Sequence, residues 1–282
     1  MRAFISAFLL LVAGPAPAEL VHLGSYEWTS NHPRFGGFSA IEVSDNGRDF
    51  VAISDRGLIA RGSFDRVDGM LAGIKLNSFD PFISSTGTDL SRADRDSEGL
   101  AVDTDGQIYV SFEWRHGVRR VNGNTMGALM RTDAFSALQP NSSLEALALD
   151  AGGALFVIPE RSGRPTRPFP VWRLIDGNWD VAFEIPRRGP FLVTGADIGP
   201  DGRFYILERD FVLVGFRTRI RRFGPDGSGE ETLLETDVLT HDNLEGISVW
   251  EDAEGLRLTL ISDDNYRSWQ RTEIVEYRLT DD

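Results

Sequence analysis

Short apolar runs occur in pairs along the chain, and a turn that contains glycine separates the two runs of each pair. Five segments share this pattern, and we call the second residue of each segment its anchor. The anchors are Ser39, Glu98, Glu145, Thr194 and Glu245. A glycine follows the first four anchors by eight residues (Gly47, Gly106, Gly153, Gly202), and the fifth segment has an insertion before Gly255. Strand-forming residues around Asn-Gly, Asp-Gly and Gly-Gly turns predict β-hairpins.

The spacing of these hairpins predicts the fold. Successive anchors are 59, 47, 49 and 51 residues apart, and two further extended stretches follow a hairpin, as at 117–121 and 128–132. No amphipathic helix of ten or more residues is evident. Four strands in each unit of about 50 residues are typical of a β-propeller. We therefore predict an all-β propeller of five four-stranded blades, with six open as the alternative because of the 59-residue gap.

The N-terminal region predicts both export and closure of the ring. Residues 1–18 combine Arg2, an apolar run over 3–13 and the small-residue site Ala16-Pro17-Ala18, as in a signal peptide. Cleavage after Ala18 would send the mature protein to the periplasm or the medium. The rest, 19–282, is expected to be a single domain, with the extended stretch 19–28 pairing with the last blade. No later apolar stretch reaches about 18 residues, so we expect no membrane insertion of the mature chain.

Charge and composition exclude several classes of partner and site. Acidic residues number 43 and Lys plus Arg 29, which gives a net charge of −14 and disfavours binding to nucleic acid. The chain has no cysteine, and its four histidines are widely separated. A metal site would therefore consist mainly of oxygen ligands, which favour a hard cation such as calcium.

Acidic residues occupy the two ends of each hairpin that are expected to meet. If each anchor faces the end of the second strand, the carboxylates gather at one mouth of the central channel. The predicted metal ligands are Asp55, Glu98, Glu113, Glu145, Glu160, Glu208, Glu245 and Asp263, with Asp96, Asn243, Asp264 and Asn265 nearby in sequence. Two like charges about 4 Å apart repel by roughly 4 kcal/mol at an effective dielectric constant near 20. A cation, arginines or protonation must offset this repulsion, unless the acids instead tie neighbouring blades together through backbone N–H groups.

Arginines follow the acids in the same places. Arg56, Arg161 and Arg209 directly succeed acidic strand ends, and Arg267 lies in the loop after the fifth hairpin. These four are the predicted substrate-binding residues, because guanidinium groups form paired hydrogen bonds with phosphate or carboxylate oxygens. Simple charge balance is the alternative reading. His241 is a candidate general acid or only a loop side chain, and Trp114 and Trp269 are candidate stacking residues.

The repeats resemble a known family. The stretches SEGLAVDTDGQIYVSFE, LEALALDAGGALFVIPER and DNLEGISVWEDAEG are similar to repeats of the bacterial phytase-like family, described as "esterase-like activity of phytase", over about residues 20–280. The resemblance implies a secreted propeller that acts on phosphoesters with the help of a cation. Ser39 and Thr194 depart from the pattern, since the other three anchors are glutamates.

Three functions remain open from the sequence. The first is a calcium-assisted phosphoesterase, with Glu98, Glu145 and Glu245 as catalytic residues and a small anionic phosphoester as substrate. The second is a metal-dependent lactonase like the gluconolactonase-type propellers, which Asn243, Asp263 and Asn265 keep open. The third is a propeller that binds a ligand or partner without catalysis. We expect a monomer in each case.

Overall fold

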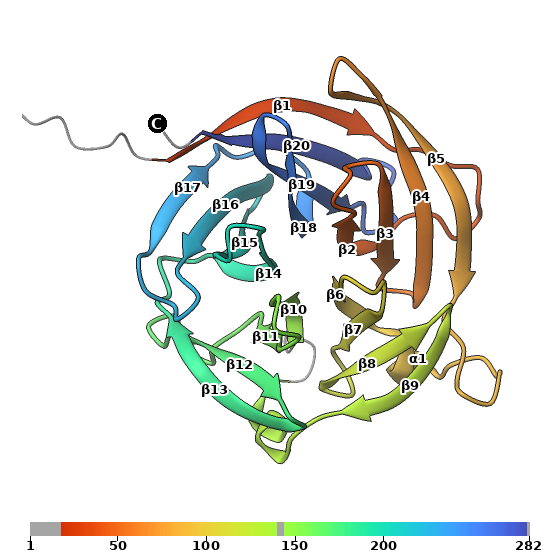
Figure 1. The fold of residues 1–282 in the computed structure, drawn as a ribbon, viewed down its shortest axis with the longest axis vertical. Helices are drawn as coiled ribbons and strands as arrows, with labels where there is room; N and C mark the ends of the chain where they lie inside the picture. Colours follow the sequence, from red (N-terminus) through yellow and green to blue (C-terminus); the bar gives the residue numbers. More distant parts are fainter. Residues whose placement is uncertain (1–17, 140–143, 281–282) are drawn as a thin grey trace, which may run out of the picture.

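The computed structural model describes residues 18–139 and 144–280. Over these residues, twenty strands form five four-stranded antiparallel sheets, which are arranged as blades around a central channel (Figure 1). The predicted all-β propeller is confirmed, and the number of blades is five. The predicted signal peptide lies outside the described residues, except for Ala18.

The blades follow one another in chain order, and each is built from the channel outward. Blade 1 consists of β2 (Phe38–Val43), β3 (Asp49–Ser54), β4 (Leu58–Val67) and β5 (Met70–Pro81). Blade 2 consists of β6 (Ser97–Val102), β7 (Ile108–Phe112), β8 (Gly117–Asn122) and β9 (Thr125–Met130). Blade 3 consists of β10 (Leu144–Leu149), β11 (Leu155–Pro159), β12 (Phe169–Ile175) and β13 (Asn178–Ile185). Blade 4 consists of β14 (Leu192–Ile198), β15 (Phe204–Val212), β16 (Gly215–Phe223) and β17 (Glu231–Glu235).

Blade 5 closes the ring with strands from both ends of the chain. It consists of β18 (Asn243–Asp252), β19 (Gly255–Asp263), β20 (Glu273–Thr280) and β1 (Glu19–Glu27). β1 is antiparallel to β20, from Glu19 opposite Thr280 to Glu27 opposite Glu273. The predicted closure by the N-terminal strand is therefore confirmed, and Figure 1 shows β1 and β20 side by side.

Helical structure in the described residues is limited to two short segments. These are α1 (Arg92–Arg95) and a 3-10 helix (Asp133–Ala137). No helix among the described residues is both long and apolar enough to cross a membrane.

The hydrophobic core is divided into clusters that lie between neighbouring blades. One cluster joins blades 4 and 5 through Tyr205, Leu244 and Val275, all buried. Between blades 5 and 1, the rings of Trp28 and Phe38 stack with centroids 4.8 Å apart. Because each sheet is covered by the next one around the ring, apolar residues on both of its faces are removed from water.

Each innermost strand carries a β-bulge at its anchor. The pairing of first and second strands shifts register between Phe38 and Ala40, Ser97 and Leu100, Leu144 and Ala146, Val193 and Gly195, and Leu244 and Gly246. The expected pairing of each anchor with the end of the second strand is therefore wrong. The residue found there precedes the anchor, by one position for Val193 opposite Glu208 and by two for Asn243 opposite Asp263. A bulge leaves its extra residue outside the ladder and redirects its side chain.

A small residue follows every anchor because the innermost strands approach one another closely at the channel. These residues are Ala40, Gly99, Ala146, Gly195 and Gly246. A Cβ atom on Gly195 would lie 2.6 Å from the backbone oxygen of Glu245, and one on Gly246 would lie 2.7 Å from Cα of Ala40. Both contacts are shorter than van der Waals packing allows, so the centre of the ring has no room for larger side chains.

We expect Gly195→Ala to lower the free energy of unfolding by about 1–3 kcal/mol, because the new methyl group would overpack two backbones. Urea denaturation measures the effect. Gly73→Ala in β5 is the matched control, because its Cβ would have only ordinary contacts, the nearest at 3.5 Å. Equal stability of the two variants would contradict the close packing at the channel.

Candidate functional site

The anchor glutamates of blades 2, 3 and 5 gather at one end of the channel, which we call the mouth. Burial raises the pKa of Glu98 well above its ordinary value, and the charges of Glu145 and Glu245 raise it further. Burial and the charges of Glu160 and Glu113 do the same for Glu145. These acids come from different blades, so the closed ring is what brings them together.

The tightest group of carboxylates belongs to blade 2. One oxygen each of Asp96, Glu98 and Glu113 lies within 4.8 Å of the other two. Asp96 precedes β6, Glu98 is the bulge residue of β6, and Glu113 follows β7. The backbone N–H of Glu113 donates to the carbonyl of Asp96 at 3.1 Å, which fixes the two loop ends together. Asp96 was not among the predicted ligands, although its position just before a first strand placed it near them.

Hydrogen bonds between acidic side chains show how crowded this group is. Burial, the charge of Asp96 and a hydrogen bond with its side chain raise the pKa of Glu113 to about 8, against the effect of a hydrogen bond with Glu145. Burial also raises the pKa of Asp96, although Trp114 donates a hydrogen bond to its carboxylate. Three oxygen-only ligands at this spacing suit a hard divalent cation.

Blade 1 contributes polar atoms to the mouth that have no hydrogen-bond partner among the described residues. These atoms are Ser39 Oγ and Asp55 Oδ1, and Ser39 is only 3% exposed. Burial raises the pKa of Asp55 to about 7, followed by the charge of Glu245, while Arg56 acts in the opposite direction. A buried polar atom without a partner is costly, so these two oxygens are suited to a bound ion, water or ligand.

Blade 5 contributes an acidic wall that is ordered by backbone donors. Burial and the charge of Glu245 raise the pKa of Asp263 to about 8, although its carboxylate accepts a hydrogen bond of 2.7 Å from Asn265 N. Asp264 Oδ1 accepts from Gly37 N and Tyr266 N, each at 3.0 Å. The wall is thus tied to blade 1 across the junction of the ring.

Arg209 is the cation at the centre of this acidic region. It forms an ion pair with Glu245, donates to Asn243 Oδ1 at 2.6 Å and lies 3.5 Å from Glu160 Oε1. Burial lowers the pKa of Arg209, but the charges of Glu245, Glu160 and Glu145 outweigh it and hold the pKa above its ordinary value. Arg209 therefore joins blades 3, 4 and 5 and stays positively charged.

The other predicted arginines have different surroundings. The Arg56 guanidinium lies 3.1 Å from the ring centroid of Tyr266, beside Asp55. Arg161 is exposed, and its Nε donates to Glu160 Oε2 at 3.0 Å. Arg267 is also exposed and lies over the ring of Trp269, 5.7 Å from its centroid.

Glu208 does not join the mouth carboxylates. It is fully buried, and its oxygens accept from Arg219 Nε at 2.7 Å and from Arg221 Nη2 at 2.7 Å. Its ladder partner is Val193, and the neighbouring Arg209, opposite Leu192, occupies the position that Asp263 has opposite Asn243 in blade 5. The expected place of Glu208 among the metal ligands is therefore corrected: its charge is already balanced inside blade 4.

His241 is packed against outer strands of blade 5. Its Nε2 is 2.5 Å from Tyr277 Oη on β20, and only 6% of the residue is exposed. Burial lowers the pKa of His241 to about 4, followed by the charges of His22 and Arg271. A histidine that is neutral at pH 7 and hydrogen-bonded to a core tyrosine is a structural residue rather than a general acid.

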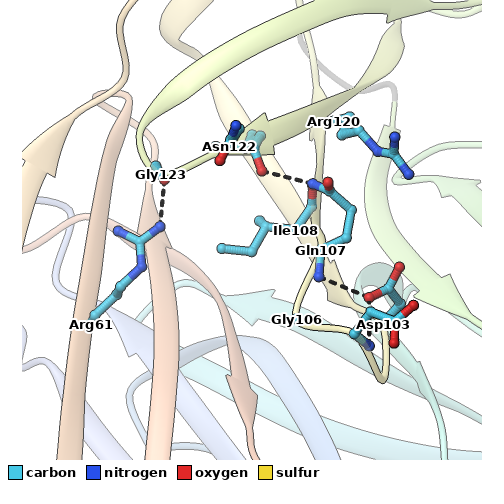
Figure 2. A pocket seen from close by; sticks show the side chains of 10 residues that line it. Arg61, Asp103, Gly106, Gln107, Ile108, Arg120, Asn122 and Gly123 are labelled. Carbon is cyan, nitrogen blue, oxygen red and sulfur yellow. Dashed lines mark hydrogen bonds between the residues drawn. The ribbon is translucent and has the colours of Figure 1, made fainter.

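A pocket in blade 2 lies away from the carboxylates. It has a volume of about 580 Å³ and is lined by turns of blade 2 together with Arg61 of blade 1. Figure 2 shows Gln107 N donating to Asp103, at 2.8 Å, and Arg61 donating to the Gly123 carbonyl. Asp103 follows the end of β6, whereas Glu98 lies near its start, so this pocket is at the opposite end of the blade.

Comparison with known proteins identifies the family. Residues 33–266 match the family described as "Phytase-like: Esterase-like activity of phytase". The chain belongs to the phytase-like family. The resemblance seen in the repeats is thereby confirmed over most of the chain. A search of curated proteins found no match.

The solved structures that resemble this chain are distant from it in sequence. The WD40 repeats of RRP9 are 8% identical, with 95% of this chain and 100% of that chain covered and a TM-score of 0.50. A protein titled as a candidate gluconolactonase is 16% identical over 95% and 94% of the two chains, with a TM-score of 0.48. Virginiamycin B lyase from Staphylococcus aureus is 14% identical over 87% and 82%, with a TM-score of 0.46. At 8% identity, the likeness to the RRP9 repeats shows the fold alone.

The raised carboxyl pKa values predict how the stability of the cation-free protein depends on pH. A carboxyl whose pKa is higher in the folded than in the unfolded state binds more protons when folded, so stability falls as pH rises between the two values. For Asp263 that range runs from 3.8 to about 8. One such group contributes a slope of at most about 1.4 kcal/mol per pH unit.

We therefore expect Asp263→Asn to be stabilised relative to wild type as pH rises from about 5 to about 8 in the presence of a chelator. Urea denaturation across this range measures the difference. The exposed Asp105, outside the mouth, provides the control Asp105→Asn, which should parallel wild type. A wild-type and Asp263→Asn difference that stays constant with pH would show that burial of this carboxyl carries no electrostatic penalty.

Proposed function

We propose that this protein is a phosphoester hydrolase that works with a divalent cation bound at the mouth. The observation that carries the proposal is the group formed by Asp96, Glu98 and Glu113, whose oxygens lie within 4.8 Å of one another. The half-buried Arg209 is linked to this group through Glu145, which it attracts and which is hydrogen-bonded to Glu113. Membership of the phytase-like family supports the reaction class. The acidic group and Arg209 together match the two needs of phosphoryl chemistry, a cation site and a guanidinium.

The residues present fit a hard cation, with calcium as the first candidate. Calcium takes six to eight oxygen ligands in flexible geometry. Asp96, Glu98 and Glu113 would hold it, and Glu145 is hydrogen-bonded to Glu113 at the edge of the group. A bound divalent cation would offset the carboxylate repulsion and polarise a phosphoryl oxygen.

The remaining residues of the mouth divide the other tasks. Glu145 and Asp55 flank the carboxylate group and are the candidates to accept a proton from the attacking water. Glu245 and Asn243 hold the Arg209 guanidinium in place, so that its positive charge faces the channel without moving when substrate binds. Arg56 and Arg161 lie farther out and would contact the remaining phosphate oxygens.

We further propose that the mature protein is a monomer that is exported after cleavage behind Ala18. β1 begins at Glu19, so this cleavage leaves the whole closing strand in the mature chain. A cleavage site after a later residue would remove part of β1 and with it the ladder partners of β20. The protein would therefore encounter its small anionic substrate outside the cytoplasm.

Calcium should raise the melting temperature of chelator-treated protein. At 100 times its dissociation constant a ligand adds about 2.7 kcal/mol to the free energy of unfolding. Glu98→Gln should reduce this shift, because it removes a charged ligand, whereas Asp105→Asn at the other end of the blade should keep it. Thermal unfolding with calcium, magnesium and manganese measures the effect, and no shift with millimolar amounts of any of them would contradict the cation site.

Wild-type protein should release phosphate from a simple phosphomonoester near neutral pH, and a chelator should abolish this release. Glu98→Gln should lower kcat, whereas Arg161→Ala should mainly raise KM if the contact is equal in ground and transition states. Loss of one positioned charged group typically costs about 2–4 kcal/mol in catalysis.

Two other outcomes of the same assay would overturn the phosphoesterase. Cation-dependent hydrolysis of a lactone but not of phosphoesters would make the protein a lactonase. Cation binding without turnover of any ester would make the mouth a binding site for a ligand or partner.

A further inference from the structure

One hairpin of blade 4 extends beyond the mouth. The pairing of β14 with β15 ends at Leu192 and Arg209, but β15 and β16 continue through three more pairs to Val212 opposite Gly215. The second strands of the other blades end earlier, at Ser54, Phe112, Pro159 and Asp263. This extension places the turn Leu213-Val214 outside the body of the blade, on the side of the carboxylates.

The end of this hairpin exposes large apolar side chains, which we call the apolar tip. Its residues are Phe211 at 63% exposure, Leu213 at 94%, Val214 at 72% and the adjacent Leu239 at 66%. Other hairpin turns of the propeller use polar pairs such as Asp68-Gly69 and Asp176-Gly177. Leu213 has φ of 28°, a left-handed conformation that glycine and asparagine adopt far more readily than leucine.

The apolar tip is continuous with the mouth. The Arg209 guanidinium lies 6.0 Å from the ring centroid of Phe216, and Phe216 lies 5.2 Å from Phe211. Leu239 N donates to the Phe216 carbonyl at 3.1 Å, which holds the last apolar residue of the tip against the hairpin. A molecule with one end beside Arg209 would therefore meet apolar surface as it leaves the mouth.

The neighbouring loop of blade 3 is basic. Residues 160–168 carry Arg161, Arg164 and Arg167, all exposed. Buried Ser162 orders the loop by donating to the carbonyls of Arg164, at 3.2 Å, and Arg167, at 2.6 Å. The loop and the hairpin start from the two partners of one ion pair, Glu160 and Arg209. A cationic loop and an apolar hairpin thus both leave the mouth from this ion pair.

We propose that the substrate is an amphiphilic phosphoester, whose phosphate enters the mouth and whose alkyl or aryl group packs on the apolar tip. This inference rests on the proposed phosphoesterase and names its substrate class. Charge complementarity favours an anionic head beside the arginines. An apolar group packed on the exposed side chains of the tip would remove apolar surface from water, which is favourable. In the reaction, water attacks phosphorus, the P–O bond to the alcohol breaks, and the alcohol leaves with a proton to give inorganic phosphate.

The test compares ligands that differ only in chain length. Release of phosphate from octyl phosphate and methyl phosphate is measured below the micelle concentration, and binding of octylphosphonate and methylphosphonate is measured by calorimetry. Burying one methylene is worth about 0.8 kcal/mol, so even partial burial should give the octyl compounds about a tenfold or greater advantage in kcat/KM and Kd.

The variants separate the tip from apolar surface elsewhere. Phe211→Ser combined with Leu213→Asn and Val214→Gly should remove the octyl preference and leave methyl phosphate unaffected. Leu213→Asn alone should reduce the preference with the smallest effect on folding. The control is Val67→Ser with Ile175→Ser, which removes exposed side chains (62% and 47%) from turns at the opposite end of blades 1 and 3.

Each outcome decides between the two proposals. Octylphosphonate binding that depends on the tip, without turnover of any ester, would support the tip and overturn the phosphoesterase. Turnover without an octyl preference, or an octyl preference that survives in the tip variant, would contradict the proposed role of the tip and support the phosphoesterase. A third outcome would also contradict the proposed role of the tip. If wild type binds neutral phosphatidylcholine vesicles, the tip variant does not, and monomeric ligands show no octyl preference, the tip is a membrane contact.

Discussion

The close approach of the innermost strands at the channel is the constraint on which the site depends. A residue as small as glycine or alanine follows each anchor, and Gly195 and Gly246 leave no space for a Cβ atom. The bulge at each anchor then sends three glutamates toward a shared, poorly solvated space. Their mutual repulsion is a consequence of closing the ring, so the fold itself creates the electrostatic problem that a cation would solve.

The same blade architecture balances buried acids in two different ways. Inside blade 4, Glu208 is neutralised by two arginines of the adjacent strand and is chemically inert. At the mouth, Arg209 balances Glu245 and Glu160, while Asp55, Glu113 and Asp263 keep strongly raised pKa values. The mouth differs from a structural ion-pair network because several of its carboxyl groups have no arginine to balance them.

Sequence reasoning recovers the fold better than the site. Hairpin turns at near-regular spacing predict the blades, and the extended stretch before Phe38 predicts the closing strand, because both follow from local turn chemistry and strand pattern. The bulges carry no such local signal, and a shift of one residue changes which face a side chain takes. The residue of β15 that corresponds to Asp263 of β19 is Arg209, so Glu208 falls inside blade 4, and Asp96 rather than Glu98 lies opposite Glu113. His241 shows a related limit, since only the packing of Tyr277 reveals that it is buried.

The most direct measurement is a crystal structure of the mature protein grown with calcium, and then with manganese to give anomalous scattering. The account predicts one ion bonded to oxygens of Asp96, Glu98 and Glu113, at the calcium–oxygen distance of about 2.3–2.6 Å. A mouth without an ion at saturating concentrations of both metals, or an ion bound only elsewhere, would contradict it.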